Sequence, residues 1–167
     1  VASSSTLGTT GANPFSIVTD SAGNVYTGNS FSNNVSKITP SGVSTILGTT
    51  GTQPRGVTID SAGNIYTANR PDGNVSKITP LGVSSILGTT GLNPVAITID
   101  SAGNVYTANA GADNVTKITP LGVSSVFGTT GTAPIAITID SAGNIYTANN
   151  GSNNVTKITP LGVSSIL

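Results

Sequence analysis

Four aspartates recur at a fixed interval and are the residues of this chain best suited to chemistry. Asp20, Asp60, Asp100 and Asp140 each open the sequence DSAGN, 40 residues after the previous copy. Carboxylates transfer protons or bind metal ions, but calcium requires several oxygens that converge on one point. One carboxylate per repeat, close to a glycine, is typical of an Asx turn, in which it accepts backbone N–H bonds. We interpret these aspartates as turn residues, and a metal site stays open only if a ring of repeats brings them together.

The residue types that are missing limit the chemistry further. The chain has no His, Cys, Met, Trp or Glu. It therefore has no Ser-His-Asp triad, no cysteine nucleophile, none of the usual zinc ligands and no glutamate pair for glycoside hydrolysis. We expect no catalytic residue, no metal and no cofactor, and we expect that the chain is not an enzyme.

Charge is sparse and balanced. Only 7% of the 167 residues are charged, and six Lys and Arg offset six Asp. Without a basic patch we expect no nucleic-acid partner, and without a long apolar run we expect no membrane partner. A Cys-free chain with a polar, weakly charged composition suggests a secreted or cell-surface protein of bacterial origin.

The elements that must position these residues form a repeat of 40 residues. LGTTG begins at residues 7, 47 and 87, and FGTTG at residue 127, with no insertion between copies. Each repeat also contains (V/I)YT and V(S/T)KITP. The tyrosines and lysines of these sequences are Tyr26, Tyr66, Tyr106, Tyr146, Lys37, Lys77, Lys117 and Lys157.

Each repeat divides into four short stretches rich in Val, Ile, Thr and Tyr, which favours strands over helices. In the third repeat they span residues 95–100, 105–109, 115–119 and 123–127. Gly- and Pro-containing turns separate them.

The side-chain alternation differs between these stretches. In the first, Val95, Ile97 and Ile99 are expected on one face. In the third, Val115 and Ile118 have opposite parity, which predicts a bulge or burial on both faces. Small residues such as Ala96 fit an innermost strand, whereas the larger Ile and Tyr side chains would fill the space between neighbouring sheets.

Four antiparallel strands in about 40 residues, repeated, are typical of β-propeller blades. We predict an all-β protein with a single repeat domain, residues 1–167. Its four blades span about 15–47, 55–87, 95–127 and 135–167, and residues 1–7 form an extra fourth-strand segment. The lysines are expected on an exposed blade edge, with their stems over apolar surface.

The repeated pattern also resembles a known family. The sequence P-x-x-(I/V)-T-(I/V)-D-S-A-G-N-(I/V)-Y-T-(A/G)-N, followed by N-V-(S/T)-K-I-T-P-x-G, looks like NHL-type propeller blades. It is also similar to virginiamycin-B-lyase-like and gluconolactonase-like propellers. The resemblance covers essentially the whole chain and implies the blade fold. The first enzymes use a catalytic His and the second bind a metal through a set that includes Glu, so neither catalytic set carries over to this chain.

Two assemblies are consistent with four blades. Propellers have about 4–8 blades, and an open half-ring would expose apolar blade faces and unpaired edges. Self-association into a homodimer would close a ring of eight blades. Alternatively, the chain is an excerpt from a longer repeat array, because it starts in mid-pattern and both ends fall at the same place in the repeat.

Differences between the four internal copies cluster in two loops, residues 12–15 and 30–33 of the first repeat and their equivalents. Both loops lie at the same end of a four-stranded meander, so in a propeller they share one face. Variable loops on a rigid scaffold are where recognition is usually located. The candidate binding residues on this variable-loop face are Phe15, Phe31, Arg55, Arg70, Asp72 and Asp113. The alternative is that these loops vary because loops tolerate change.

The sequence thus favours a non-enzymatic β-propeller repeat protein that acts as a binding or scaffold module, with a protein or glycan as ligand. A self-assembling structural repeat protein without a ligand, recently amplified or designed, is the alternative. A lyase-like or lactonase-like enzyme is the weakest reading. Asn34, Asn74, Asn114 and Asn154 each begin an N-x-(S/T) glycosylation sequon, which we interpret as one accidental tripeptide copied four times.

Overall fold

Every repeat forms four short β-strands in the computed structural model, which describes residues 5–167. The first repeat contains β1 (Pro14–Thr19), β2 (Val25–Asn29), β3 (Asn34–Ile38) and β4 (Ser44–Thr49). The second contains β5 (Pro54–Ile59), β6 (Ile65–Asn69), β7 (Asn74–Ile78) and β8 (Ser84–Thr89). The third contains β9 (Pro94–Ile99), β10 (Val105–Asn109), β11 (Asn114–Ile118) and β12 (Ser124–Thr129). The fourth contains β13 (Pro134–Ile139), β14 (Ile145–Asn149), β15 (Asn154–Ile158) and β16 (Ser164–Ile166).

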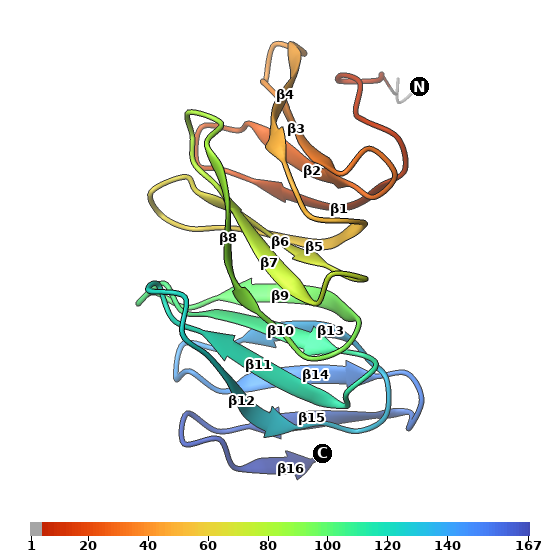
Figure 1. Cartoon of the computed structure of the whole chain (residues 1–167), viewed down its shortest axis with the longest axis vertical. Coiled ribbons are helices and arrows are strands. Elements are labelled where there is room, and N and C mark those ends of the chain that lie inside the picture. The colour runs from red at the N-terminus through yellow and green to blue at the C-terminus, as the bar shows by residue number, and fades with distance from the viewer. Residues whose placement is uncertain (1–4) are drawn as a thin grey trace, which may run out of the picture.

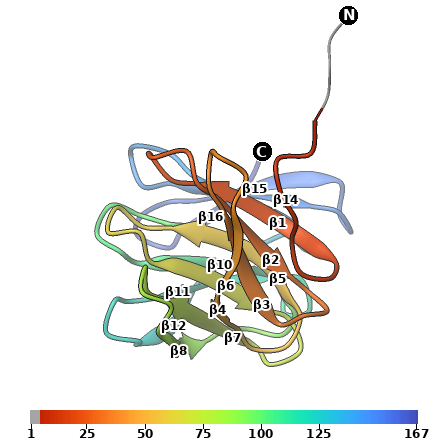
Figure 2. The same cartoon turned by 90° about the horizontal axis from the view of Figure 1, so that it is seen from above.

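Each repeat folds into its own antiparallel sheet, in which the strands pair in chain order (Figure 1). The all-β prediction with four four-stranded antiparallel blades is therefore confirmed. The loops of the four sheets project from two opposite ends of the strands (Figure 2). This arrangement gives the molecule two loop-bearing faces.

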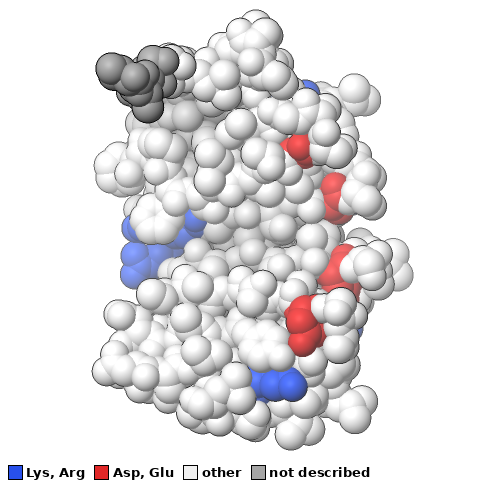
Figure 3. All heavy atoms as spheres, turned by 180° about the vertical axis from the view of Figure 1, so that it is seen from behind, with Lys and Arg blue, Asp and Glu red and all other residues white. Residues whose placement is uncertain are grey.

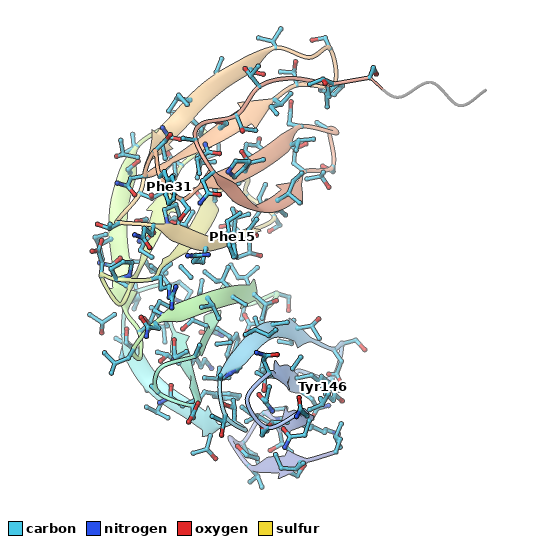
Figure 4. The ribbon with its side chains drawn as sticks, turned by 90° about the vertical axis from the view of Figure 1, so that its right-hand side faces the viewer. Phe15, Phe31 and Tyr146 are labelled. Carbon is cyan, nitrogen blue, oxygen red and sulfur yellow. The ribbon has the colours of Figure 1, made fainter. Side chains whose placement is uncertain are left out.

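The four sheets follow one another along an open arc (Figure 4). The first strands of the sheets, β1, β5, β9 and β13, line its concave side, and each packs against the first strand of the next sheet. The fourth strands lie on the convex side. The innermost strand is thus the one with small side chains such as Ala96, as the sequence predicts.

The apolar core is divided into three clusters, one between each pair of neighbouring sheets. Between the first two sheets, Tyr26 and Val35 of the first sheet pack against Val57, Ile65 and Ile78 of the second. The same positions pack together between the second and third sheets and between the third and fourth. The large Ile and Tyr side chains therefore hold the blades together, as expected.

Two bulges recur in the sheets. Pairing of β3 with β4 shifts register between Val35 and Ser36, and both residues are buried, which agrees with the broken alternation seen in the third stretch. A second bulge falls at the start of the first strand, at Val95 in β9. The expectation that Val95 shares a face with Ile97 and Ile99 is wrong, because the bulge resets the alternation and only the two isoleucines join the cluster.

The segment before β1 differs from the expected fourth strand. Residues 1–4 lie outside the described residues, and residues 5–13 form no strand. A fourth strand is defined by its pairing with a third strand, and no such pairing is found within the described residues 5–13. Within residues 5–167 the structure has no helix long and apolar enough to cross a membrane.

Candidate functional site

The DSAGN aspartates are enclosed by their own turns. Oδ1 of Asp60 accepts the backbone N–H groups of Ala62, at 3.0 Å, and Asn64, at 2.8 Å. Oδ2 accepts the Asn64 side-chain amide at 2.8 Å and the Tyr66 hydroxyl at 2.9 Å. The other three aspartates accept the same four bonds. The prediction of an Asx turn is confirmed.

These bonds shift the acidity of both partners. The Asn24 side chain, the backbone N–H groups and the Tyr26 hydroxyl lower the pKa of Asp20 despite its partial desolvation. Burial, together with the hydrogen bond to Asp20, raises the pKa of Tyr26 to about 12. The ionised carboxylate and the neutral phenol are thus the stable pair at neutral pH. Among residues 5–167, no three acidic or other metal-ligating side chains gather into a metal site.

A lysine lies over each of these tyrosines. The Lys77 Nζ is 5.7 Å from the centroid of the Tyr66 ring, its cross-strand neighbour. The same pairing recurs in the other three sheets, at 5.7 Å for Lys37 and Lys117 and 5.9 Å for Lys157. The lysines therefore sit on the third strand, not on the blade edge as expected, and their ammonium groups make cation–π contacts.

The two variable loops of each sheet lie against each other. In the first sheet the Ser30 N–H donates to the Asn13 carbonyl at 2.9 Å, and the Phe31 N–H donates to the Ala12 carbonyl at 3.2 Å. The sequence analysis placed both loops at one end of the blade, and this geometry agrees. The space-filling view shows a column of acidic side chains along one side of the molecule and a group of basic side chains on the opposite side, with further basic side chains close to the acidic column (Figure 3).

Phe15 and Arg55 are brought together on this face. Each is the second residue of a first strand, in β1 and β5, and Val95 and Ile135 occupy the same position in β9 and β13. The Arg55 guanidinium carbon lies 4.1 Å from the centroid of the Phe15 ring. Phe15 lies on the concave side of the arc (Figure 4). The stacked pair therefore stands at the inner rim of the variable-loop face.

The Asp72 and Asp113 side chains accept backbone hydrogen bonds from neighbouring loops. The Asp72 carboxylate accepts the Thr52 N–H at 2.6 Å, and the Asp113 carboxylate accepts the Ala133 N–H at 2.8 Å. The second bond joins the third sheet to the fourth. Both carboxylates have a structural partner that the sequence analysis did not foresee, which distinguishes them from the other candidates.

Phe31 and Arg70 occupy the loop that follows the second strand. Phe31 is 72% exposed, and Arg70 is half-buried with its backbone N–H bonded to the Gln53 carbonyl at 3.3 Å. Phe31 lies farther from the concave rim than Phe15 (Figure 4). The structure thus leaves two aromatic and two basic side chains as the groups of this face that are most open to a ligand.

Sequence reasoning missed a buried polar network in each sheet. The fully buried Asn69 side chain donates to Asn74 at 2.7 Å and to Ser76 at 2.8 Å, and it accepts the Thr67 hydroxyl at 3.0 Å. The Gly51 N–H donates to the same Ser76 hydroxyl at 3.0 Å. The recurring T-(A/G)-N sequence was the available signal. Because Asn74 is the sequon asparagine, this network gives the repeated tripeptide a structural role.

Comparisons with known proteins agree with this architecture. A family model described as a beta-propeller repeat matches residues 44–68. A solved virginiamycin B lyase from Staphylococcus aureus, a catalytically inactive variant with quinupristin, matches with a TM-score of 0.82 and 22% identity over 95% of this chain and 55% of that chain. A chain of the nidogen–laminin complex gives 0.72 and 19% over 84% and 57% of the two chains. Hydrazine synthase from Kuenenia stuttgartiensis gives 0.78 and 18% over 93% and 49%. A comparison with curated proteins gives no match.

This chain has a β-propeller fold. The propeller resemblance drawn from the sequence is confirmed at the level of the fold, which is what identities of this size show. The four-bladed propeller chain spans about half the length of the solved chains that it matches, with 55%, 57% and 49% of those chains covered.

Proposed function

We propose that this propeller is a non-enzymatic binding module whose ligand docks on the variable-loop face. The observation that carries the proposal is the Arg55 guanidinium stacked at 4.1 Å on the Phe15 ring at the inner rim of that face. Stacking holds a guanidinium flat and leaves its edge available for bidentate hydrogen bonds. The pair is therefore suited to a ligand that presents a carboxylate beside an apolar group.

A protein segment is the ligand that fits this surface best. Arginine and aromatic side chains are enriched at the centres of protein–protein interfaces. Phe15 and Phe31 are 53% and 72% exposed, so both rings have apolar area to bury. Among the described residues, the Nε atom of Arg55 is buried without a hydrogen-bond partner, so we assign the carboxylate of the ligand to the terminal nitrogens.

The absence of catalytic groups supports a non-enzymatic role. The lyase in the comparison is described as inactive when a histidine is replaced by alanine, and this chain has no histidine. The repeated aspartates, which are the best candidates for an acid or base, each accept four hydrogen bonds within their own turns. Turnover of a lactone, an ester or a streptogramin by the purified chain would overturn this part of the proposal.

A binding assay on matched variants tests the ligand proposal. A panel of fluorescein-labelled peptides, each with Asp or Glu beside Leu or Phe, is titrated with the protein and followed by fluorescence polarisation. We expect saturable binding that Arg55→Gln weakens about tenfold, because a charge-assisted hydrogen bond is lost. Lys77→Gln removes the same charge from the same sheet, away from the loops, and is expected to leave affinity unchanged.

Three outcomes would count against this function. If no peptide saturates, or if both variants weaken binding equally, the loop face does not recognise an acidic peptide. If polygalacturonate binds in the same assay and the peptides do not, the ligand is an acidic glycan. In the first case the alternative, a structural repeat protein that only assembles, becomes the better reading.

A further inference from the structure

The last sheet of the arc leaves an apolar face exposed. In each of the other three sheets, the equivalent face is covered by the next sheet. Val155 of β15 is 38% exposed, whereas Val35, Val75 and Val115 at the same position are all 0% exposed. Tyr146 is more exposed than the three equivalent tyrosines, and it lies on the last sheet of the arc (Figure 4). Leu167 is 70% exposed at the end of the same face.

The first sheet ends the arc with the opposite face. Ile17 of β1 is 66% exposed, whereas Val57 and Ile97 at the same position are 7% and 8% exposed. Within the chain, this kind of face is always covered by the kind of face that the last sheet leaves open. Val35 and Tyr26, for example, pack against Val57 in the cluster between the first two sheets. The two open ends are therefore the two halves of an interface that the molecule already forms three times.

The outermost strand of the last sheet is incomplete. In the first sheet, Asn34 and Val35 pair with Thr49 and Gly48 at the end of β4. In the last sheet the residue pairs stop at Thr156 with Ile166, and one further bond runs from the Leu167 N–H to the Val155 carbonyl at 2.9 Å. In the other three sheets, the two residues at the end of the fourth strand have the sequence Gly-Thr.

Gly8 and Thr9, at the other end of the chain, are that sequence. They follow the same path over the first sheet as Gly48 and Thr49 follow over the second. A Cβ on Gly8 would lie 2.7 Å from Cγ2 of Ile38, and a Cβ on Gly48 would lie 2.7 Å from Cγ2 of Ile78.

The bonds that anchor this segment also match. The Gly11 N–H donates to the Ser36 hydroxyl at 3.1 Å, as the Gly51 N–H donates to the Ser76 hydroxyl at 3.0 Å. The segment from Gly8 to Gly11 thus follows the path that the linkers between sheets follow elsewhere in the chain.

We propose that a second copy of this chain occupies both open faces, so that two copies form a two-fold ring of eight blades. The last sheet of each copy packs on the first sheet of the other, and Gly8 and Thr9 of one copy extend β16 of the other. Both contacts are head-to-tail, and a closed ring leaves neither open face exposed. This proposal goes beyond the binding function and does not depend on it.

A loop bond supports the same register. The Asn33 side chain accepts the Gln53 N–H of the next sheet at 2.9 Å, and Asp113 accepts the Ala133 N–H of the next sheet at 2.8 Å. Asn153 occupies this position in the last sheet. In the ring it would accept the Asn13 N–H of the second copy, so that the interface between copies repeats a bond found between sheets.

The ring also predicts that Leu7 of one copy and Leu167 of the other compete for the same position. Leu7 and Leu167 occupy the same position in the repeat, and both are exposed, at 48% and 70%. Leu7 of one copy and Leu167 of the other would occupy one site in the ring. Removal of residues 1–7 should therefore strengthen the association, because it frees this site for Leu167.

Light scattering on a sizing column, over a dilution series, tests the ring. The measured mass of the 167-residue protein is expected to be twice the 16.4 kDa of one chain. Val155→Lys and Ile17→Lys, one on each open face, should each give a monomer with an unchanged circular dichroism spectrum. Leu161→Lys is the control, because Leu161 is 91% exposed on a turn outside both faces. It should leave the dimer intact, and deletion of residues 1–7 should lower the dissociation constant.

Other results would overturn the proposal. A wild-type monomer at all concentrations, or a dimer that both face variants leave intact, would show that a second copy does not cover these faces. A ladder of species that grows with concentration would show open head-to-tail chains and no ring. Peptide binding by a wild-type monomer would leave the proposed function standing while the ring proposal fails.

Discussion

The Tyr66 hydroxyl donates to the Asp60 carboxylate at 2.9 Å while Lys77 lies over the tyrosine ring at 5.7 Å. The three residues come from the turn before β6, from β6 and from β7, so a single cluster joins a turn to two strands. It recurs in every sheet. This constant cluster holds one end of each blade in place, and the loops at the opposite end vary without loss of the fold.

The first prediction concerns the turn carboxylate. Asp60→Asn keeps one side-chain oxygen but cannot accept all four bonds, and it loses the charge that strengthens them. We expect the free energy of unfolding to fall by about 1–2 kcal/mol, measured by urea titration. Asp113→Asn is the matched control. It should be nearly neutral, because Asn33 already accepts the equivalent bond with an amide oxygen. Equal losses in both variants would contradict this account.

The second prediction is a loss of stability at alkaline pH. Burial and the bond to Asp20 raise the pKa of Tyr26 from 10.0 to about 12 in the folded chain. Burial and the equivalent aspartates also raise the pKa values of Tyr66 and Tyr106. The folded state therefore favours the neutral phenols. The contribution of Tyr26 to stability is complete below pH 10 and is lost as the pH rises through about 12, and the contributions of Tyr66 and Tyr106 persist to higher pH. Urea unfolding from pH 8 to 12 should show this decline, and it should be shallower in Tyr26→Phe. A flat profile would refute the coupling.

The third prediction is the opposite dependence in acid. The Asn24 side-chain amide and other donors lower the pKa of Asp20 below 3.8, and hydrogen bonds outweigh desolvation to lower those of Asp60 and Asp100 as well. Their contribution to stability is present above pH 3.8 and is lost as the pH falls further. Thermal melts from pH 6 to 2 should show falling midpoints. The slope should be smaller in Asp60→Asn, and an equal slope would show that other groups cause the loss.

The sequence predicts structure that depends on a few consecutive residues. It does not predict contacts between residues that lie far apart along the chain. The Asx turn at Asp60 follows from five consecutive residues, so the sequence predicts it fully. The network around the buried Asn69 joins two strands, β6 and β7, to a linker, and a linear pattern does not show that these meet. The stack of Arg55 on Phe15 depends on how close neighbouring first strands lie. The bulge at Val95 arises where the variable loop enters the strand, and simple alternation does not reveal it.

The fourth prediction uses two glycines of unlike surroundings. A Cβ on Gly28 would lie 3.7 Å from its nearest neighbour, an ordinary contact, and the equivalent residues are Ala68, Ala108 and Ala148. Gly28→Ala should therefore raise the free energy of unfolding by about 0.4–1 kcal/mol, because the unfolded chain loses entropy. A Cβ on Gly88 would lie 2.7 Å from Cγ2 of Ile118. Gly88→Ala should lower the free energy of unfolding by about 1–3 kcal/mol. Urea titration of both variants checks the signs, and the same sign in both would be evidence against this packing.

The last prediction restores a bond that the second sheet lacks. Position 73 is Gly, with φ +60, where the first and third sheets carry Asn33 and Asp113, with φ 51 and 50. Those side chains each accept a backbone N–H from the next sheet, and glycine has no side chain to do so. Gly73→Asn fits the backbone, because Asn tolerates positive φ, and its amide oxygen would reach the Asn93 N–H. We expect a gain of about 0.5–1.5 kcal/mol, the usual contribution of one hydrogen bond. Gly73→Ala places a side chain without an acceptor in the same strained conformation, so it should destabilise the chain. Urea titration separates the two cases: if Asn is no better than Ala at this position, the side-chain bond between sheets contributes nothing to stability.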